Sequence, residues 1–238
     1  MRSTKARELD PANLSASAIK PRKARAVGLS RERVVAECLR YLRENPTEPL
    51  TLARAAASVD ATSMALYRHF RDGADLCDAI VTEVLAGLGD EIPTDAEWGV
   101  QVRAWMEGLH RRLVETPQCV GMLNTKSGLS PAWLRTAAVL RRSLAASGLS
   151  GPALSEGVFW VSMAATGFVK QTLTAPMAAQ IDGTIEAIRR LGPAEAAELD
   201  AFAADVPHIY SHALEIMIER ILASVEALRA RSPPRAAD

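Results

Sequence analysis

The segment from residue 51 to residue 70 constrains the fold of this chain more than any other stretch. Thr51 is a favourable N-cap, and apolar residues recur after it at helical spacing, which predicts a first short helix. Residues 59–61 form a predicted turn, and Thr62 supplies a second N-cap. A second helix is predicted over residues 63–70. Two helices joined by so short a turn are typical of a helix-turn-helix unit.

The second predicted helix, 63–70, carries a chemically mixed surface. Ser63, Met64, Tyr67 and Arg68 lie off its apolar face and combine hydroxyl, apolar, aromatic and cationic groups. That combination suits a groove of nucleic acid, where phosphates, base edges and thymine methyl groups lie close together. We expect Arg68 to read guanine, because an arginine fork pairs with two acceptors of that base.

The sequence around this unit resembles the DNA-binding signature of the tetracycline-repressor (TetR) family of transcriptional regulators. The resemblance covers residues 30–88 and rests, at unbroken spacing, on Leu50-Thr51, Ala56, Leu66-Tyr67, His69-Phe70 and Leu76. Two positions depart from the family pattern. Asp60 stands at the turn where the family usually has Gly, and Gly73 stands where it usually has Lys beside a phosphate. Arg71 is the candidate substitute for that lysine.

The resemblance also implies which residues contact DNA. By it, Tyr67 and His69 contact the phosphate backbone, and residues at the start of the second helix meet the base edges. The full expected set is Thr51, Thr62, Ser63, Met64, Tyr67, Arg68, His69, Arg71 and Gly73. The implied partner is a double-stranded, pseudo-palindromic operator that a homodimer reads through two half-sites.

Charge is distributed unevenly along a chain whose net charge is zero. Residues 1–72 carry 14 basic and 8 acidic residues, whereas residues 73–238 carry 14 basic and 20 acidic ones. Such asymmetry points to an anionic partner for the N-terminal part. Residues 1–29 are predicted to be a disordered basic arm, and its cations at 20–25 either enter a DNA groove or are simply solvated.

Helical periodicity continues through the rest of the chain, without β-branched runs between Gly-rich turns. We therefore expect an all-α fold with two domains. An N-terminal three-helix helix-turn-helix domain with its connecting helix would span residues 30–88. A C-terminal helical domain for ligand binding and dimerisation would span residues 95–231.

The second domain contains all four tryptophans and several further large apolar residues. In a family whose members bind small molecules, these residues are candidates for an apolar effector pocket. The candidate pocket residues are Trp105, Met106, Leu109, Met122, Trp133, Phe159, Trp160, Met163 and Phe168. The alternative for each of them is a place in the ordinary hydrophobic core.

Two late helices, predicted at 153–173 and 207–231, carry wide apolar stripes. In the family, two late helices from each subunit form a four-helix dimer interface. The implied interface residues are Val158, Val161, Ala165, Phe168, Leu214, Met217, Ile221 and Leu228. The alternative is that both stripes belong to the core of one subunit.

No catalytic motif stands out, since the chain has no nucleophile elbow, no HExxH and no phosphate loop. We therefore expect no catalytic residues, no cofactor and no metal. His208 and His212 are four residues apart, a spacing that suits a metal, but no further ligands accompany them. Cys38, Cys77 and Cys119 lie far apart in the sequence and are predicted to be reduced structural thiols.

No apolar run reaches the roughly 18 residues of a membrane span, and no signal-peptide core follows the charged start. The sequence therefore predicts a cytoplasmic protein without a membrane partner. The resemblance implies a DNA-binding regulator, most simply a repressor released from its operator by an apolar effector. Two alternatives remain. One is a small-molecule-binding enzyme on a helical scaffold, and the other is an interaction module whose helix-turn-helix no longer binds DNA.

Overall fold

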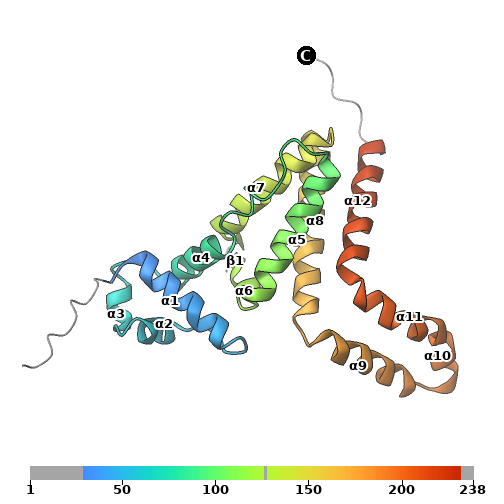
Figure 1. The fold of residues 1–238 in the computed structure, drawn as a ribbon, viewed down its shortest axis with the longest axis horizontal. Coiled ribbons are helices and arrows are strands. Elements are labelled where there is room, and N and C mark those ends of the chain that lie inside the picture. The colour runs from blue at the N-terminus through green and yellow to red at the C-terminus, as the bar shows by residue number, and fades with distance from the viewer. Residues whose placement is uncertain (1–28, 126–127, 232–238) are drawn as a thin grey trace, which may run out of the picture.

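The computed structural model describes residues 29–125 and 128–231, and within these ranges the chain is almost entirely helical (Figure 1). The N-terminal helices are α1 (Arg31–Glu44), α2 (Leu52–Ser58), α3 (Ser63–Leu66) and α4 (Gly73–Val84). The later helices are α5 (Trp98–Glu115), α6 (Cys119–Met122), α7 (Pro131–Ala146), α8 (Gly151–Thr172), α9 (Met177–Arg189), α10 (Pro193–Glu198), α11 (Asp200–Ser211) and α12 (Ala213–Arg231). Two short strands, β1 (Asn124–Thr125) and β2 (Gly128–Leu129), pair antiparallel. The predicted all-α fold is confirmed.

Polar side chains cap the first four helices, at Thr51 and Thr62 as the sequence predicts. Ser30, Thr51, Thr62 and Asp72 each accept a hydrogen bond from the backbone N–H three residues further on. Such caps satisfy donors that the first turn of a helix leaves without partners. Helices as short as α2 and α3 are unstable in isolation, so the caps and the core beneath them are both needed.

The second helix of the helix-turn-helix unit is shorter than predicted. α3 ends at Leu66 and not at residue 70, and the chain continues as turns, in which the His69 N–H donates to the Leu66 carbonyl at 2.9 Å. The guanidinium of Arg31 donates to the carbonyl oxygen of His69 at 2.8 Å. That side chain satisfies a carbonyl that a longer helix would have paired with its own backbone.

The last helix also begins later than predicted, at Ala213 instead of residue 207. Pro207 lies inside α11, and the break between the two helices falls at His212. The His212 N–H and its ring Nδ1 both lie within hydrogen-bond distance of the His208 carbonyl oxygen, at 3.1 Å and 3.0 Å. A side chain that competes for a helix carbonyl in this way favours an end to the helix.

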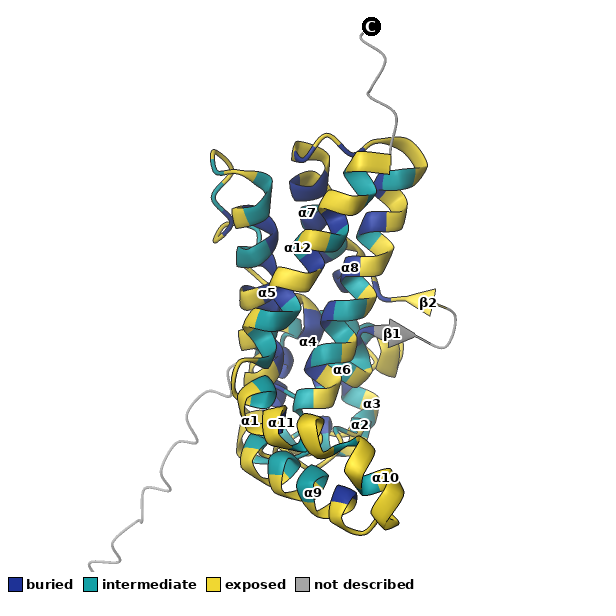
Figure 2. Cartoon of the chain, turned by 90° about the vertical axis from the view of Figure 1, so that its right-hand side faces the viewer, coloured by how far each residue is buried: buried dark blue, intermediate teal, exposed yellow. Residues whose placement is uncertain are grey.

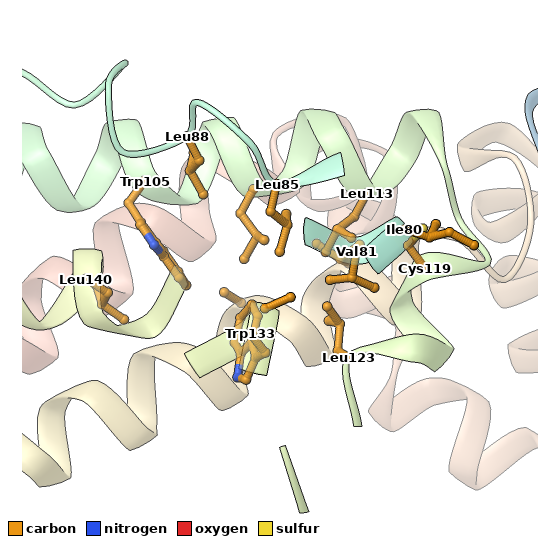
Figure 3. Packing of buried hydrophobic residues seen from close by; sticks show 14 of the residues in the cluster. Ile80, Val81, Leu85, Leu88, Trp105, Leu113, Cys119, Leu123, Trp133 and Leu140 are labelled. Atoms are coloured by element: carbon orange, nitrogen blue, oxygen red, sulfur yellow. The ribbon is translucent and has the colours of Figure 1, made fainter. Parts of the chain in front are cut away.

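α4 joins the N-terminal helices to the rest of the fold. It packs against α1 on one side and against α6 and α7 on the other. Its buried residues Ile80 and Val81 belong to one continuous hydrophobic core that runs from the helix-turn-helix into the second part of the chain. Figure 3 shows side chains of α4, α5 and α7 pointing toward one another there, among them Val81, Trp105 and Trp133. A displacement of α7 therefore acts directly on α4.

Helices α5, α7, α8 and α12 pack together as the main bundle of the second part. Helices α9, α10 and α11 leave this bundle and project from it at the end of α8 (Figure 1). α9 packs on α11, and Ile188 and Val206 are their buried residues. Figure 2 shows that this projection is otherwise largely exposed. It therefore has a small core of its own.

Candidate DNA-binding surface and ligand pocket

The turn between α2 and α3 is built around Asp60, whose φ of 55° lies in the left-handed region. Aspartate tolerates this region better than most residues, so it fills a position where glycine would be the easiest choice. The Ala61 N–H donates to the Ala56 carbonyl at 3.0 Å and closes the turn. The departure from the family's glycine is therefore accommodated, and α3 leaves the turn at a fixed angle to α2.

The outer surface of α3 carries large side chains that the fold leaves in solvent. Leu66 and Phe70 are buried beneath it, whereas Met64 is 76% exposed and Tyr67 is half exposed. Arg68 is exposed as well and forms no ion pair with any residue that the structure describes. An apolar, an aromatic and an unpaired cationic group thus share one short surface. Exposed side chains of this kind usually mark a surface that binds a partner.

The other predicted DNA-binding residues lie around this surface. Thr51 and Thr62 cap α2 and α3, and Gly73 is the first residue of α4. Ser63 and His69 are half-buried, whereas Arg71 is exposed over 88% of its side chain. These positions lie on the helix-turn-helix pair, which occupies the end of the molecule away from α12 (Figure 1).

Two residues outside the predicted DNA-binding set support this surface from behind. Arg31 on α1 donates to Asp75 on α4 through both guanidinium nitrogens, at 2.7 and 3.3 Å. The same guanidinium bonds the His69 carbonyl and lies 4.5 Å from the centre of the Phe70 ring. Asp75 also accepts from the Arg71 N–H at 3.0 Å. The segment after α3 is therefore held between α1 and α4.

The electrostatics of this cluster follow from its hydrogen bonds. Donation from Arg31, with a further contribution from the Arg71 N–H, lowers the pKa of Asp75 to about 2. Asp75 is thus ionised at neutral pH. No sequence motif announces the pair, because Arg31 and Asp75 are 44 residues apart and meet only when α1 crosses α4.

An apolar pocket of about 660 Å³ lies between α6, α7 and α8. Of the predicted pocket residues, Trp133, Phe159 and Met163 line it. Trp133 comes from α7, and the other two come from the outer face of α8. The volume is in the range of pockets that take small organic molecules.

The remaining predicted pocket residues lie elsewhere, so the sequence-based set needs correction. Trp105, Met106 and Leu109 are buried in the core of α5, because their side chains form the face that packs on the neighbouring helices. The indole N–H of Trp105 donates to a carbonyl of α7 at 3.0 Å. Met122, although half-buried, is not among the residues that line the pocket. The core alternative is correct for the α5 residues.

Two further members of that set face other helices. Trp160 is half exposed and donates to Ser224 Oγ on α12 at 3.0 Å. Phe168 lies against His110 on α5, with 5.8 Å between the ring centres. Burial lowers the pKa of His110.

The structure also redistributes the predicted dimer residues. Val161, Ala165 and Ile221 are buried inside the single chain, because α8 packs on α5 and α12 through these side chains. Val158 lines the apolar pocket, and Phe168 faces α5. Leu214, Met217 and Leu228 are half-buried and pack against the core of the same chain. For the buried three, the prediction of an intersubunit contact is wrong, since no surface remains on them.

Hydrogen bonds connect the walls of the pocket to the N-terminal helices. Gln118, which directly precedes α6, donates through Nε2 to the carbonyls of Leu42 at 3.2 Å and Asn45 at 2.8 Å. Asp78 on α4 accepts from the Ala132 N–H in the first turn of α7 at 2.8 Å. These three bonds join α6 and α7, which line the pocket, to α1 and α4 of the N-terminal part. The sequence did not indicate any of them.

A second cavity, of about 820 Å³, lies where α1 and α4 face α5 and α7. Its walls are polar and carry both signs of charge, and the lining ionisable residues are Arg31, Glu32, Arg43, Asp78, Glu83, Arg112, Glu115 and Arg135. Arg135 is within 3.4 Å of Thr82 Oγ1 across this space. The cavity marks the junction that changes shape if α7 moves relative to α1.

In the described part of the chain, no group of three or more His, Cys, Asp or Glu residues is placed to hold a metal. The rings of His208 and His212 lie 4.4 Å apart. Cys38 and Cys119 are buried, and burial raises the pKa of each thiol to about 11. None of the helices within residues 29–125 and 128–231 has the length and apolarity that a membrane span requires.

Comparison with solved structures identifies the architecture. ActR of Streptomyces coelicolor in complex with actinorhodin matches with a TM-score of 0.65 and 19% identity, over 84% of this chain and 98% of that one. SCO7222, a TetR from the same organism, matches with a TM-score of 0.67 and 20% identity, over 84% and 99%. Mycobacterium smegmatis BioQ matches with a TM-score of 0.58 and 21% identity, over 82% of this chain and 99% of that one.

The chain has the fold of TetR family transcriptional regulators. No family model matches the sequence, and no curated protein matches it. At identities near 20% the likeness establishes the TetR fold, and it covers the helix-turn-helix, the connecting helix α4 and the helical second part together. The resemblance seen in the sequence is thereby confirmed for the fold.

Proposed function

We propose that this chain is a DNA-binding transcriptional regulator that a small-molecule effector controls. The observation that carries the proposal is the exposed surface of α3, where Arg68 has no ion-pair partner within the described residues and lies beside exposed Met64 and Tyr67. On a TetR fold, this surface is in the position from which a helix-turn-helix enters a major groove. The DNA phosphates would be contacted from the starts of three helices. The residues there are Thr51 at α2, Thr62 at α3, and Arg71 and Gly73 near α4.

The effector would bind the apolar pocket between α6, α7 and α8. ActR, which shares the fold, has been crystallised with actinorhodin, and this supports a ligand role for the second part. Gln118 and Asp78 support a route from this pocket to the N-terminal helices, since each joins a pocket wall to α1 or α4. An effector that favours a shifted α6 or α7 would alter the position of α4 and hence the spacing of the two recognition helices. The effector must bind the DNA-incompetent conformation more tightly.

The proposal includes a homodimer, because a helix-turn-helix gains affinity when it reads two half-sites. Trp160 on α8, with Ala223 and Ala227 on α12, is exposed in the single chain and lies on the side where these helices meet. We therefore place the interface there. Ala223→Arg is expected to shift the protein to monomer in light scattering. A variant that stays fully dimeric would place the interface elsewhere.

The DNA-binding proposal is tested by selection from a random double-stranded DNA library with the purified full-length protein. The native protein is expected to enrich one pseudo-palindromic sequence. Arg68→Ala should weaken binding to that sequence by about tenfold, with relaxed preference at one guanine, as the loss of a bidentate contact predicts. Arg142→Ala is the matched control, since Arg142 is an exposed cation on α7, outside the helix-turn-helix and the proposed interface.

The salt dependence of binding separates specific reading from weak attraction. Binding to the selected site should fall steeply between 50 and 200 mM salt, about tenfold or more, because phosphate contacts release counterions. If the native protein enriches no sequence at low salt, the proposal fails, and the interaction-module alternative takes its place.

A further inference from the structure

The apolar pocket between α6, α7 and α8 has an asymmetric charge. Two cations, Arg141 on α7 and Lys170 on α8, are among the residues that line it, and no carboxylate is. Both are exposed, and neither is in an ion pair within the described residues. Elsewhere in the same part of the chain, Arg103 pairs with Glu215 and Arg112 pairs with Glu91, whereas Arg142 and Arg220 are exposed without an ion pair within the described residues. The pocket therefore has a net positive lining.

The two cations lie toward opposite ends of the pocket. α7 and α8 are consecutive helices joined by a short turn at residues 147–150, and they pack against each other. Arg141 is therefore level with Ser155 near the start of α8, whereas Lys170 lies near its end. At about 1.5 Å per residue, roughly 20 Å of helix separates these two levels. The pocket is thus elongated, with one positive charge toward each end.

Between the cations the wall is apolar. Phe159 is 69% exposed and Met163 is 55% exposed, and both belong to the pocket lining opposite the buried ring of Trp133. Leaving such large apolar side chains in water is unfavourable, so an occupant with an apolar body gains free energy by covering them. Ser162 lies between them on α8, and its buried Oγ has no hydrogen-bond partner among the described protein atoms. Rotation of this side chain toward the pocket would let an oxygen or nitrogen of the occupant hydrogen-bond to the hydroxyl.

We propose that this pocket binds an elongated amphipathic organic anion, with an apolar body along Trp133, Phe159 and Met163 and an acidic group that pairs with Arg141 or Lys170. A carboxylate, sulfonate or acidic phenol meets this description. A cationic ligand would meet two like charges and no counter-charge. That this anion acts as the effector rests on the proposed function, whereas its binding to the pocket does not.

The test compares two fluorescent probes that share one ring system. 8-Anilinonaphthalene-1-sulfonate carries a negative charge, and N-phenyl-1-naphthylamine is neutral. Each is titrated into the full-length protein without DNA, and Kd is obtained from the rise in fluorescence. The sulfonate is expected to bind more tightly than the neutral probe by about fivefold or more, as one or two solvent-screened charge pairs provide.

Variants of the two cations locate the charge effect. The double variant Arg141→Gln, Lys170→Gln should raise the Kd of the sulfonate about fivefold. The Kd of the neutral probe should change by no more than about twofold. The matched control is Arg142→Gln, Arg220→Gln, which removes the same charge from exposed positions outside the pocket lining and should change neither Kd. The inference is wrong if the Kd of the sulfonate rises no more than about twofold in the Arg141→Gln, Lys170→Gln variant. It is also wrong if the native protein binds the sulfonate no more tightly than the neutral probe.

A third variant verifies that the probes occupy this pocket. Gly167 lines it, and a Cβ added there meets no atom within 4 Å, so Gly167→Leu fills the pocket without disturbing the helix. The affinity of this variant for both probes should fall about tenfold. Unchanged affinities would place the probes elsewhere and overturn the inference. The amount of probe bound per chain is also measured as the protein concentration rises and dimerisation increases. A fall in this amount would overturn the inference too, because a second copy would then cover Phe159.

The two proposals fail in different experiments. Charge-selective probe binding without any selected DNA sequence would refute the proposed function and leave the anion site standing. A selected operator combined with equal affinity for both probes would refute the anion site alone.

Discussion

Asp75→Ala is expected to destabilise the protein by releasing the segment behind the recognition surface. The Asp75 carboxylate accepts from Arg31 Nη2 at 2.7 Å and from the Arg71 N–H at 3.0 Å. Without it, the Arg31 guanidinium keeps its bond to the His69 carbonyl but loses its tie to α4. The start of α4 would then be held to α1 and to the turn after α3 by apolar packing alone.

The magnitude follows from the shift of the carboxyl pKa. The Arg31 hydrogen bond is the main reason that the pKa of Asp75 is about 2 instead of 3.8. A difference of this size corresponds to at most roughly 2.5 kcal/mol of folding free energy. The Asp75 side chain is 15% exposed, but Arg31 is 39% exposed, so solvent screens the pair. We therefore expect a loss of about 1–2 kcal/mol at pH 7.

The sign of the pH dependence is determined by the direction of the shift. Because folding lowers the pKa of Asp75, its carboxylate stabilises the folded state above pH 4, and the stabilisation is lost as pH falls toward 2. Urea unfolding of the native protein and Asp75→Ala at pH 7 and pH 3 measures this directly. The difference in unfolding free energy should fall by about half between the two pH values.

Asp90→Ala is the control, since Asp90 is an exposed loop aspartate whose one hydrogen bond within the described residues is donated by its backbone N–H. It should change the unfolding free energy by less than about 0.5 kcal/mol at either pH. A difference for Asp75→Ala that stays constant from pH 7 to pH 3 would refute the electrostatic reasoning. A difference below about 0.5 kcal/mol at pH 7 would refute the structural role of the pair.

Three further substitutions test other parts of the structure. Asp60→Val should destabilise by about 1–2 kcal/mol, because a β-branched residue resists the φ of 55°, whereas Asp60→Gly should change stability far less; thermal unfolding of the two variants decides this. Trp105→Phe should lower the unfolding free energy by about 2 kcal/mol, because it removes buried ring volume and an indole hydrogen bond of 3.0 Å. The midpoint of urea unfolding measures this loss. Gln118→Ala should speed hydrogen exchange near the end of α1, whose carbonyls it bonds; unchanged exchange there would count against the connection from α6 to α1.

Local sequence was sufficient to predict the helix-turn-helix. Its N-caps, its turn at Asp60 and the apolar spacing beneath α3 are short-range features, and each depends on residues a few positions apart. The end of α3 was wrong because Arg31, far away in the sequence, supplies the bond to the His69 carbonyl. The predicted start of the last helix at residue 207 was wrong, because Pro207 lies inside α11 and does not begin a new helix. The local competition at His212 ends α11 instead.

The second part of the chain shows what sequence could not decide. An apolar stripe at helical spacing states only that a helix face is buried, and the same pattern serves core, pocket or subunit interface. Tertiary packing placed Trp105 and Leu109 in the core and left Phe159 and Met163 beside a pocket. Which neighbour covers a given face depends on how the helices cross, which is set by all their side chains together.

The sequence by itself therefore determined the helices, their caps and the composition of the recognition surface, because these arise from interactions between near neighbours. Only the tertiary structure brought Arg31 to Asp75, Gln118 to the end of α1, and Arg141 and Lys170 to one pocket without a carboxylate. These groups belong to different elements, and they meet because burial of a shared core fixes how the helices pack.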